Sequence, residues 1–120
     1  MRRRLSPTLG PLKITIIIPA FNEERLLGET LGHVNSARAA FTALGLESEL
    51  IVCDNNSTDR TADIARAAGA VVVFEPVNQI ARARNRGADS ATGDWLLFID
   101  ADSHPNAALF ADVEIGRAHV

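Results

Sequence analysis

Short apolar runs alternate with longer amphipathic stretches along most of the chain. Four runs have the length and composition of buried strands, at 14–19, 50–53, 71–74 and 95–99. Three helices are expected between them, at 23–44, 57–69 and 80–92. In the first of these, apolar residues recur at steps of three and four, which is the spacing of one helix face.

This alternation of strand and helix predicts right-handed crossovers and a parallel sheet. We therefore expect an α/β fold with a Rossmann-like sheet in the order 3-2-1-4 and helices on both faces. Local signals favour particular helix ends: Asn22 as the first cap, Gly45 as the first stop, and Ser57 or Thr58 as the second cap. Pro105 is expected to open a last helix.

Polar residues follow three of the expected strands. Asn22 and Glu23 follow the first strand, 54–57 (DNNS) follow the second, and 100–102 (DAD) follow the fourth. Each cluster taken alone could be a solvated turn. In parallel sheets, however, ligands bind outside the carboxyl ends of the strands, where the strand order reverses. With the order 3-2-1-4 all three clusters meet there, which predicts a site.

The fourth strand ends in two carboxylates. Asp100 and Asp102 are two residues apart in extended chain, so their side chains are expected to project to the same side. Neighbouring carboxylates repel one another and favour a bound cation. The chain lacks a G-x-G-x-x-G loop and a Walker loop, and 19–23 (PAFNE) stand after the first strand instead. A phosphorylated ligand would then need a divalent cation, so the residues predict a metal-dependent site for a nucleotide or another diphosphate.

Composition narrows the class of protein. The 120 residues are 47% hydrophobic and carry a net charge of −3, which fits one globular domain or part of one. No basic stripe occurs beyond 2–4 (RRR), so nucleic acid is not an expected partner. No apolar run approaches a membrane span, and we expect a cytoplasmic protein with at most peripheral contact at the inner face of the membrane. The single Cys53 lies in an apolar run and is expected to be buried, in a reducing setting.

The two ends of the chain are expected to lie outside the domain. Residues 1–12 read as a flexible N-terminal lead, and 13–113 as a domain that is truncated at its C-terminus. Residues 114–120 (EIGRAHV) resemble the translation of a common sequencing adapter, so we expect a non-native read-through tail. His119 is accordingly left out of functional reasoning.

Four motifs stand in order along the chain: 16–24 (IIIPAFNEE), 52–59 (VCDNNSTD), 83–87 (ARNRG) and 98–102 (FIDAD). Over roughly residues 13 to 105 they resemble the successive motifs of family two nucleotide-sugar glycosyltransferases of the GT-A fold. The resemblance implies a bacterial enzyme of cell-envelope polysaccharide synthesis that uses Mn²⁺ or Mg²⁺. It implies transfer of a sugar from a nucleotide-diphosphate sugar, of the uridine type, to an acceptor hydroxyl with inversion at the anomeric carbon. This chain would hold the donor-binding half.

The resemblance also assigns roles at the first two strand ends. The backbone of Pro19, Ala20 and Phe21 would line the nucleotide, and Glu23 would accept hydrogen bonds from ribose hydroxyls. Asp54 would accept the imide N–H of uracil or a similar base. The alternative for Asp54 is a cap for the helix that follows.

At the fourth strand end, the resemblance places Asp100 near the ribose and the metal. Ala101 belongs to the same nucleotide-sugar site, and Asp102 would bind the metal that bridges the diphosphate oxygens. Arg84 would meet the base or the diphosphate, and Arg82 and Arg86 are competing candidates for that role.

Other residues near these motifs have simpler expected roles. Asn85 and Gly87 are expected to serve packing. His33 and His104 are expected at the surface or as caps.

Inverting transfer needs a general base that deprotonates the acceptor hydroxyl. In the resembling family this carboxylate lies in the following half of the domain, so here we expect it beyond Val113. One alternative function is a non-catalytic nucleotide-binding fragment. Another is an aspartate-nucleophile phosphatase of the haloacid dehalogenase type, although there the D-x-D usually follows the first strand, whereas here it follows the fourth and leads into 103–105 (SHP).

Overall fold

The computed structural model describes residues 12–102 and, for the backbone alone, residues 114–117. Within them one sheet has the strand order β3-β2-β1-β4-β5. Its strands are β1 (Lys13–Ala20), β2 (Glu47–Asp54), β3 (Val71–Phe74), β4 (Trp95–Phe98) and β5 (Glu114–Arg117). The helices are α1 (Leu27–Ala43), α2 (Thr61–Ala67) and α3 (Ile80–Asp89).

The first four strands are parallel, and β1 lies at the centre. Ile17 in β1 stands opposite Ile51 in β2 and Phe98 in β4. This confirms the predicted fold class and the order 3-2-1-4. Strand β5 pairs antiparallel with β4, with Glu114 opposite Phe98, where the sequence predicts only a non-native tail.

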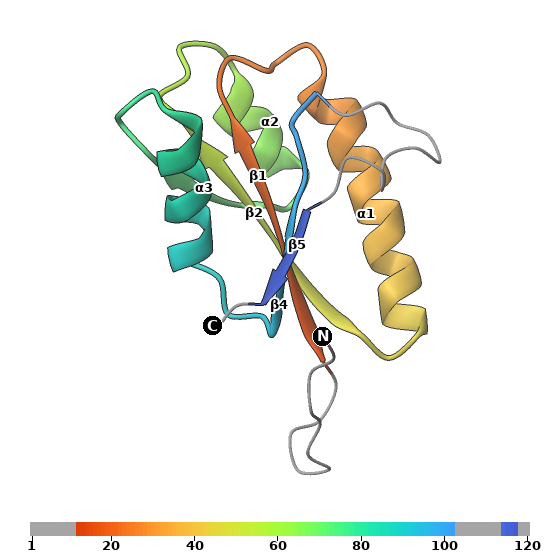
Figure 1. The fold of residues 1–120 in the computed structure, drawn as a ribbon. Coiled ribbons are helices and arrows are strands. Elements are labelled where there is room, and N and C mark those ends of the chain that lie inside the picture. Colours follow the sequence, from red (N-terminus) through yellow and green to blue (C-terminus); the bar gives the residue numbers. More distant parts are fainter. Residues whose placement is uncertain (1–11, 103–113, 118–120) are drawn as a thin grey trace.

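Helices α1 and α2 cover one face of the sheet, and α3 covers the other (Figure 1). Side chains of β1 alternate between these faces, because successive residues of a strand point in opposite directions. Ile16 and Ile18 belong to the core beneath α1 and α2, whereas Ile17 meets α3. A Cβ atom added at Gly87 of α3 would lie 2.5 Å from Ile17 Cγ2. Gly87 therefore lets the helix approach the sheet closely, as predicted.

Helix α1 begins later than predicted. The Glu23 carbonyl accepts hydrogen bonds from the N–H groups of Leu26 and Leu27, so residues 23–26 form a turn that leads into the helix. Asn22, the predicted cap, has a φ of 50° and its Oδ1 accepts the N–H of Thr58, 36 residues away. Gly45, with a φ of 81°, follows the end of α1 as predicted.

Two other helix ends also differ from the prediction. Helix α2 begins at Thr61, whose N–H donates to Asp59 Oδ1, so neither Ser57 nor Thr58 caps it. Helix α3 ends at Asp89, before Thr92, because the chain turns there to enter β4. The predicted helix at Pro105 lies outside the described residues.

Two smaller predictions about side chains are confirmed: Cys53 is fully buried and His33 is exposed. Burial, together with the nearby Glu75 carboxylate, raises the pKa of the Cys53 thiol to about 11. Among the described helices, none is both long and apolar enough to cross a membrane.

Candidate functional site

The carboxyl ends of β1, β2 and β4 lie side by side. Ala20 stands opposite Asp54 in the register of β1 and β2, and the N–H of Ile99 donates to the carbonyl of Ile17. The residues that follow these strands therefore gather at one edge of the sheet. Glu23, Asp54 and Asp100 all lie at this edge.

The segment after β4 places two carboxylates on the same side. Asp100 and Asp102 are exposed. Ile99, which precedes them, and Ala101, which lies between them, are only 2% and 3% exposed. The hydroxyl of Thr30 in α1 donates to the carbonyl of Ala101 at 2.9 Å. This bond holds the segment against α1 and leaves both carboxylates facing solvent.

Glu23 shares this acidic environment. Partial burial raises the pKa of its carboxyl, and the negative charges of Asp102, Asp59 and Asp100 raise it further. Each of these charges acts on Glu23 because the loops after β1, β2 and β4 come together. An environment that disfavours another negative charge favours a cation.

The carboxylates fit a divalent ion that is shared with a phosphorylated ligand. Across the side chains described in 12–102, no three His, Cys, Asp or Glu residues are grouped so that they could hold a metal by themselves. Mg²⁺ at phosphate sites is usually held by one or two carboxylates, with substrate phosphates and water completing its coordination, and Mn²⁺ favours similar oxygen ligands. Asp102 and Asp100 offer such a pair.

Asp54 lies at the end of β2, and its side chain bonds to the turn that follows. It is 7% exposed, and its Oδ1 accepts the N–H of Ser57 at 3.0 Å. It therefore caps the turn after β2 and not a helix. Ser57 Oγ in turn accepts the N–H of Asn22 at 2.9 Å, which links the loops after β2 and β1.

Asn55 is a buried residue of the site that the sequence analysis does not single out. Its Nδ2 donates to the carbonyls of Glu75 and Val77, at 3.1 and 2.6 Å, and its Oδ1 accepts the N–H of Gln79 at 3.1 Å. These three bonds fix the loop between β3 and α3 to the end of β2. The available signal was a polar residue directly after a buried strand.

A hollow of about 300 Å³ opens beside Asn55. It is lined by Phe21, Asn55, Asn78, Gln79 and Ile80. Phe21 and Ile80 are exposed to 48% and 61%, so they present apolar surface that a flat ring could cover. The amide side chains can both donate and accept hydrogen bonds. Of these residues, Phe21 has a predicted role in the site, and Asn55 belongs to the predicted polar cluster 54–57.

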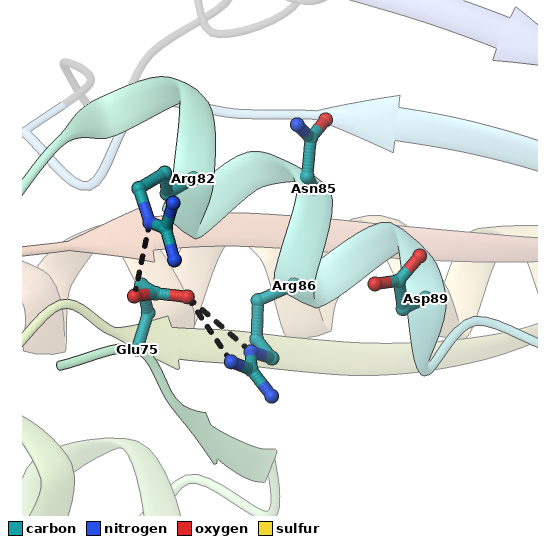
Figure 2. A pocket seen from close by; sticks show the side chains of 5 residues that line it. All are labelled: Glu75, Arg82, Asn85, Arg86 and Asp89. Carbon is teal, nitrogen blue, oxygen red and sulfur yellow. Dashed lines mark hydrogen bonds and ion pairs between the residues drawn. The ribbon is translucent and has the colours of Figure 1, made fainter. Parts of the chain in front are cut away.

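Two of the three candidate arginines bind a carboxylate of this protein. Glu75 is 2% exposed, and its oxygens lie 3.4 Å from Arg82 Nε and 3.3 Å from Arg86 Nη2. Figure 2 shows both guanidinium groups directed at Glu75. The hydrogen bond from the Val77 N–H, followed by those from Arg86 and Arg82, lowers the pKa of the Glu75 carboxyl. Asn85 lines a second hollow of about 300 Å³ together with Glu75 and the two arginines. Its side chain is exposed, so the packing role predicted for it is wrong.

Arg84 faces a different neighbour. Its guanidinium carbon lies 4.4 Å from the centre of the Phe98 ring, a distance typical of a cation–π contact. Phe98 is the last residue of β4 and stands two positions before Asp100. Among the three arginines, Arg84 is thus the one that contacts the strand leading to the paired aspartates.

Known proteins share both this sequence pattern and this fold. The sequence profile named Glycosyl transferase family 2 matches residues 15–111. An uncharacterised glycosyltransferase of Mycobacterium tuberculosis is 35% identical over 94 residues, covering 78% of this chain and 38% of that protein. The chain thus spans little more than a third of the length of this relative.

Solved structures give the same result. Glucosyl-3-phosphoglycerate synthase of M. tuberculosis in complex with uridine diphosphate (UDP) has a TM-score of 0.67 and 32% identity, covering 83% of this chain and 37% of that one. A structure of the same enzyme with Mn²⁺, UDP and glucosyl-3-phosphoglycerate has a TM-score of 0.63 and 32% identity, over 78% and 36% of the two chains. The match of the family profile over most of the chain, together with the shared fold, shows that this chain belongs to glycosyl transferase family 2.

Proposed function

We propose that the chain is the donor-binding part of a glycosyltransferase that moves a sugar from a nucleotide-diphosphate sugar to an acceptor hydroxyl, with inversion and with Mn²⁺ or Mg²⁺. The observation that carries the proposal is the gathering of Glu23, Asp100 and Asp102 at the carboxyl ends of the neighbouring strands β1 and β4. Solved relatives that contain UDP together with Mn²⁺ or Mg²⁺ support a donor of the uridine type.

The base would bind at the end of β2. A uracil ring could cover Phe21 and Ile80 in the hollow beside Asn55. Asp54 would accept the imide N–H through Oδ2, because Oδ1 already accepts the N–H of Ser57. The backbone of Pro19 to Phe21 would line the nucleoside.

The ribose and the diphosphate would lie toward β4. Glu23 would accept hydrogen bonds from ribose hydroxyls, Asp100 would stand near the ribose and the metal, and Asp102 would hold the metal. The bound ion would neutralise charge on the diphosphate oxygens and so help the nucleoside diphosphate to leave. Arg84 would add a positive charge near the base or the diphosphate.

The reaction also needs a proton acceptor for the acceptor hydroxyl. A positioned general base is typically worth about 10²- to 10⁴-fold in rate. We propose a carboxylate beyond Val113 for this role, as the resemblance implies.

Calorimetric titration with UDP, with and without MnCl₂, tests the donor site. The wild type should bind UDP more tightly with Mn²⁺. Asp102→Asn should lose this metal-dependent gain, because a neutral carboxamide binds a divalent cation more weakly than a carboxylate does. Asp63→Asn is the control, since Asp63 lies on α2 and pairs with Arg66 at the surface. No UDP binding by the wild type would refute the proposed function. An unchanged Mn²⁺ dependence in Asp102→Asn would show that the ion sits elsewhere.

A further inference from the structure

The loop after β1 is tied to the start of α2 by bonds that converge on one threonine. Thr61 is fully buried, and its Oγ1 accepts the N–H of Glu23 at 2.9 Å. The same hydroxyl donates its hydrogen to Asp59 Oδ1. Asp59 Oδ2 accepts the N–H of Glu24 at 3.2 Å. One carboxylate and one hydroxyl therefore fix the backbone of two consecutive residues in the loop.

The loop after β1 also accepts a hydrogen bond from the segment before α2. Glu24 Oε1 accepts the N–H of Arg60 at 3.1 Å, next to the residues that hold Glu24 itself. Burial alone would raise the pKa of Asp59, but the hydrogen bonds from Thr61 and Glu24 outweigh it and lower the pKa. Asp59 is thus charged at neutral pH, and a charged acceptor strengthens the hydrogen bonds that it receives.

Glu23 needs such an anchor because its neighbours repel it. The charges of Asp102, Asp59 and Asp100 act on its carboxyl group, so Asp59 repels the side chain of Glu23 while it holds the backbone N–H of Glu24. A loose loop would relax by carrying the Glu23 side chain away from these carboxylates and toward water. A backbone N–H that is bonded to a buried hydroxyl prevents that movement.

We propose that Asp59 and Thr61 are positioning residues that hold Glu23 at the donor site. This inference rests on the proposed function. Neither residue needs to touch the nucleotide, because each acts through the backbone of Glu23 and Glu24. Loss of the pair should weaken binding of a nucleoside diphosphate while the sheet and the rest of the site stay in place.

The chain contains a matched control at the other end of the sheet. Thr15 is also fully buried, its Oγ1 accepts the N–H of Gly93 at 2.9 Å, and it donates to Glu49 Oε2 at 2.6 Å. The order of donor and acceptor is the same as at Thr61. Thr15 lies near the amino end of β1, whereas the candidate site lies at the carboxyl end. Thr15→Val and Thr61→Val thus remove equivalent hydroxyl groups, but only Thr61→Val is expected to weaken the binding of UDP.

Calorimetry with UDP and MnCl₂ on the full chain tests the inference. Thr61→Val should weaken UDP binding about five- to tenfold, which corresponds to the roughly 1–1.4 kcal/mol that one hydrogen bond contributes. Thr61→Ser restores the hydroxyl and should restore the affinity. Thr15→Val should bind UDP as the wild type does.

A second pair of variants covers the case in which Thr61→Val does not fold. Asp59→Ala removes a half-buried carboxylate and should also weaken UDP binding, whereas Asp63→Ala removes the same charge from an exposed position on α2 and should not. If Thr61→Val or Asp59→Ala folds and binds UDP like the wild type, the positioning role is refuted and the proposed function still holds. If the wild type itself does not bind UDP, the proposed function fails, and this inference fails with it.

Discussion

The close contact between α3 and β1 gives a quantitative prediction at Gly87. In Gly87→Ala the new methyl group would lie 2.5 Å from Ile17 Cγ2, well inside an ordinary contact. Ile17 is fully buried and branched at Cβ, so this methyl group has little room to move. The helix must then shift away from the sheet.

Two opposing terms set the size of the effect. Overpacking of this kind typically costs about 1–3 kcal/mol, and the short distance places Gly87→Ala in the upper part of that range. Alanine is favoured over glycine inside a helix by about 1 kcal/mol. We expect a net loss of about 1–2 kcal/mol in the free energy of unfolding, or roughly 5–10 °C in Tm.

Urea unfolding followed by circular dichroism measures this loss. Gly32→Ala is the control, because Gly32 lies in α1 and a Cβ there would meet nothing within 4 Å. That variant should gain up to about 1 kcal/mol from helix propensity alone. Ile17→Leu keeps the side-chain volume but removes Cγ2, so Gly87→Ala should cost less in that background. Equal effects of Gly87→Ala and Gly32→Ala would show that the contact between Gly87 and Ile17 does not limit the approach of α3 to the sheet.

Three further predictions concern the site and its surroundings. The raised pKa of Glu23 means that the folded state binds the proton of this carboxyl more tightly than the unfolded state does, so Glu23 lowers the stability of the wild type as pH rises above about 4.5. Glu23→Gln should therefore gain more stability relative to the wild type at pH 7 than at pH 4. An equal difference in stability at the two pH values would contradict this. Cys53, with a pKa of about 11 and no exposure, should react with a thiol reagent at pH 8 only after urea unfolds the chain, and rapid labelling of the native protein would argue against its burial. Asn55→Ala removes three hydrogen bonds between the end of β2 and the loop before α3, and it should lower the free energy of unfolding in urea by about 2–4 kcal/mol. A loss below about 1 kcal/mol would mean that the loop keeps its conformation without these bonds.

The sheet could be predicted from the sequence because its signals are local. The run before Asp100 is apolar without interruption, and in the run before Pro19 only Thr15 is polar. This pattern indicates strands that are buried on both faces. The alternation expected after this strand continues as an alternation of burial, because Asp100 and Asp102 are exposed while Ile99 and Ala101 are buried.

The helix starts could not be predicted in the same way, because their partners are distant in the sequence. Asn22 has the chemistry of a cap, but its Oδ1 bonds to Thr58, in a loop that follows a different strand. Thr61 and Asp59 bind the backbone of Glu23 and Glu24 across a similar separation. Rules for capping consider only the nearest residues, so they assign Asn22 to the helix that follows it and do not find its bond to Thr58.

The partners of the arginines in α3 could not be predicted from the sequence either. Helical spacing places Arg82 and Arg86 on one face, four residues apart, but it does not say what that face meets. The answer depends on Glu75, a carboxylate directly after β3 that becomes buried only when α3 packs beside it. Sequence reasoning could therefore name the candidates without assigning them.

Paramagnetic relaxation by Mn²⁺ would show whether a nucleotide and a metal bind together at the carboxyl edge of the sheet. Backbone amide spectra would be recorded with UDP as substoichiometric MnCl₂ is added, with MgCl₂ as the diamagnetic reference. We expect the signals of Glu23 and of residues 100–102 to broaden first, while those of Lys13 and Glu49 near the amino ends of their strands persist. Selective broadening at the amino ends, or no selective broadening at all, would contradict this expectation.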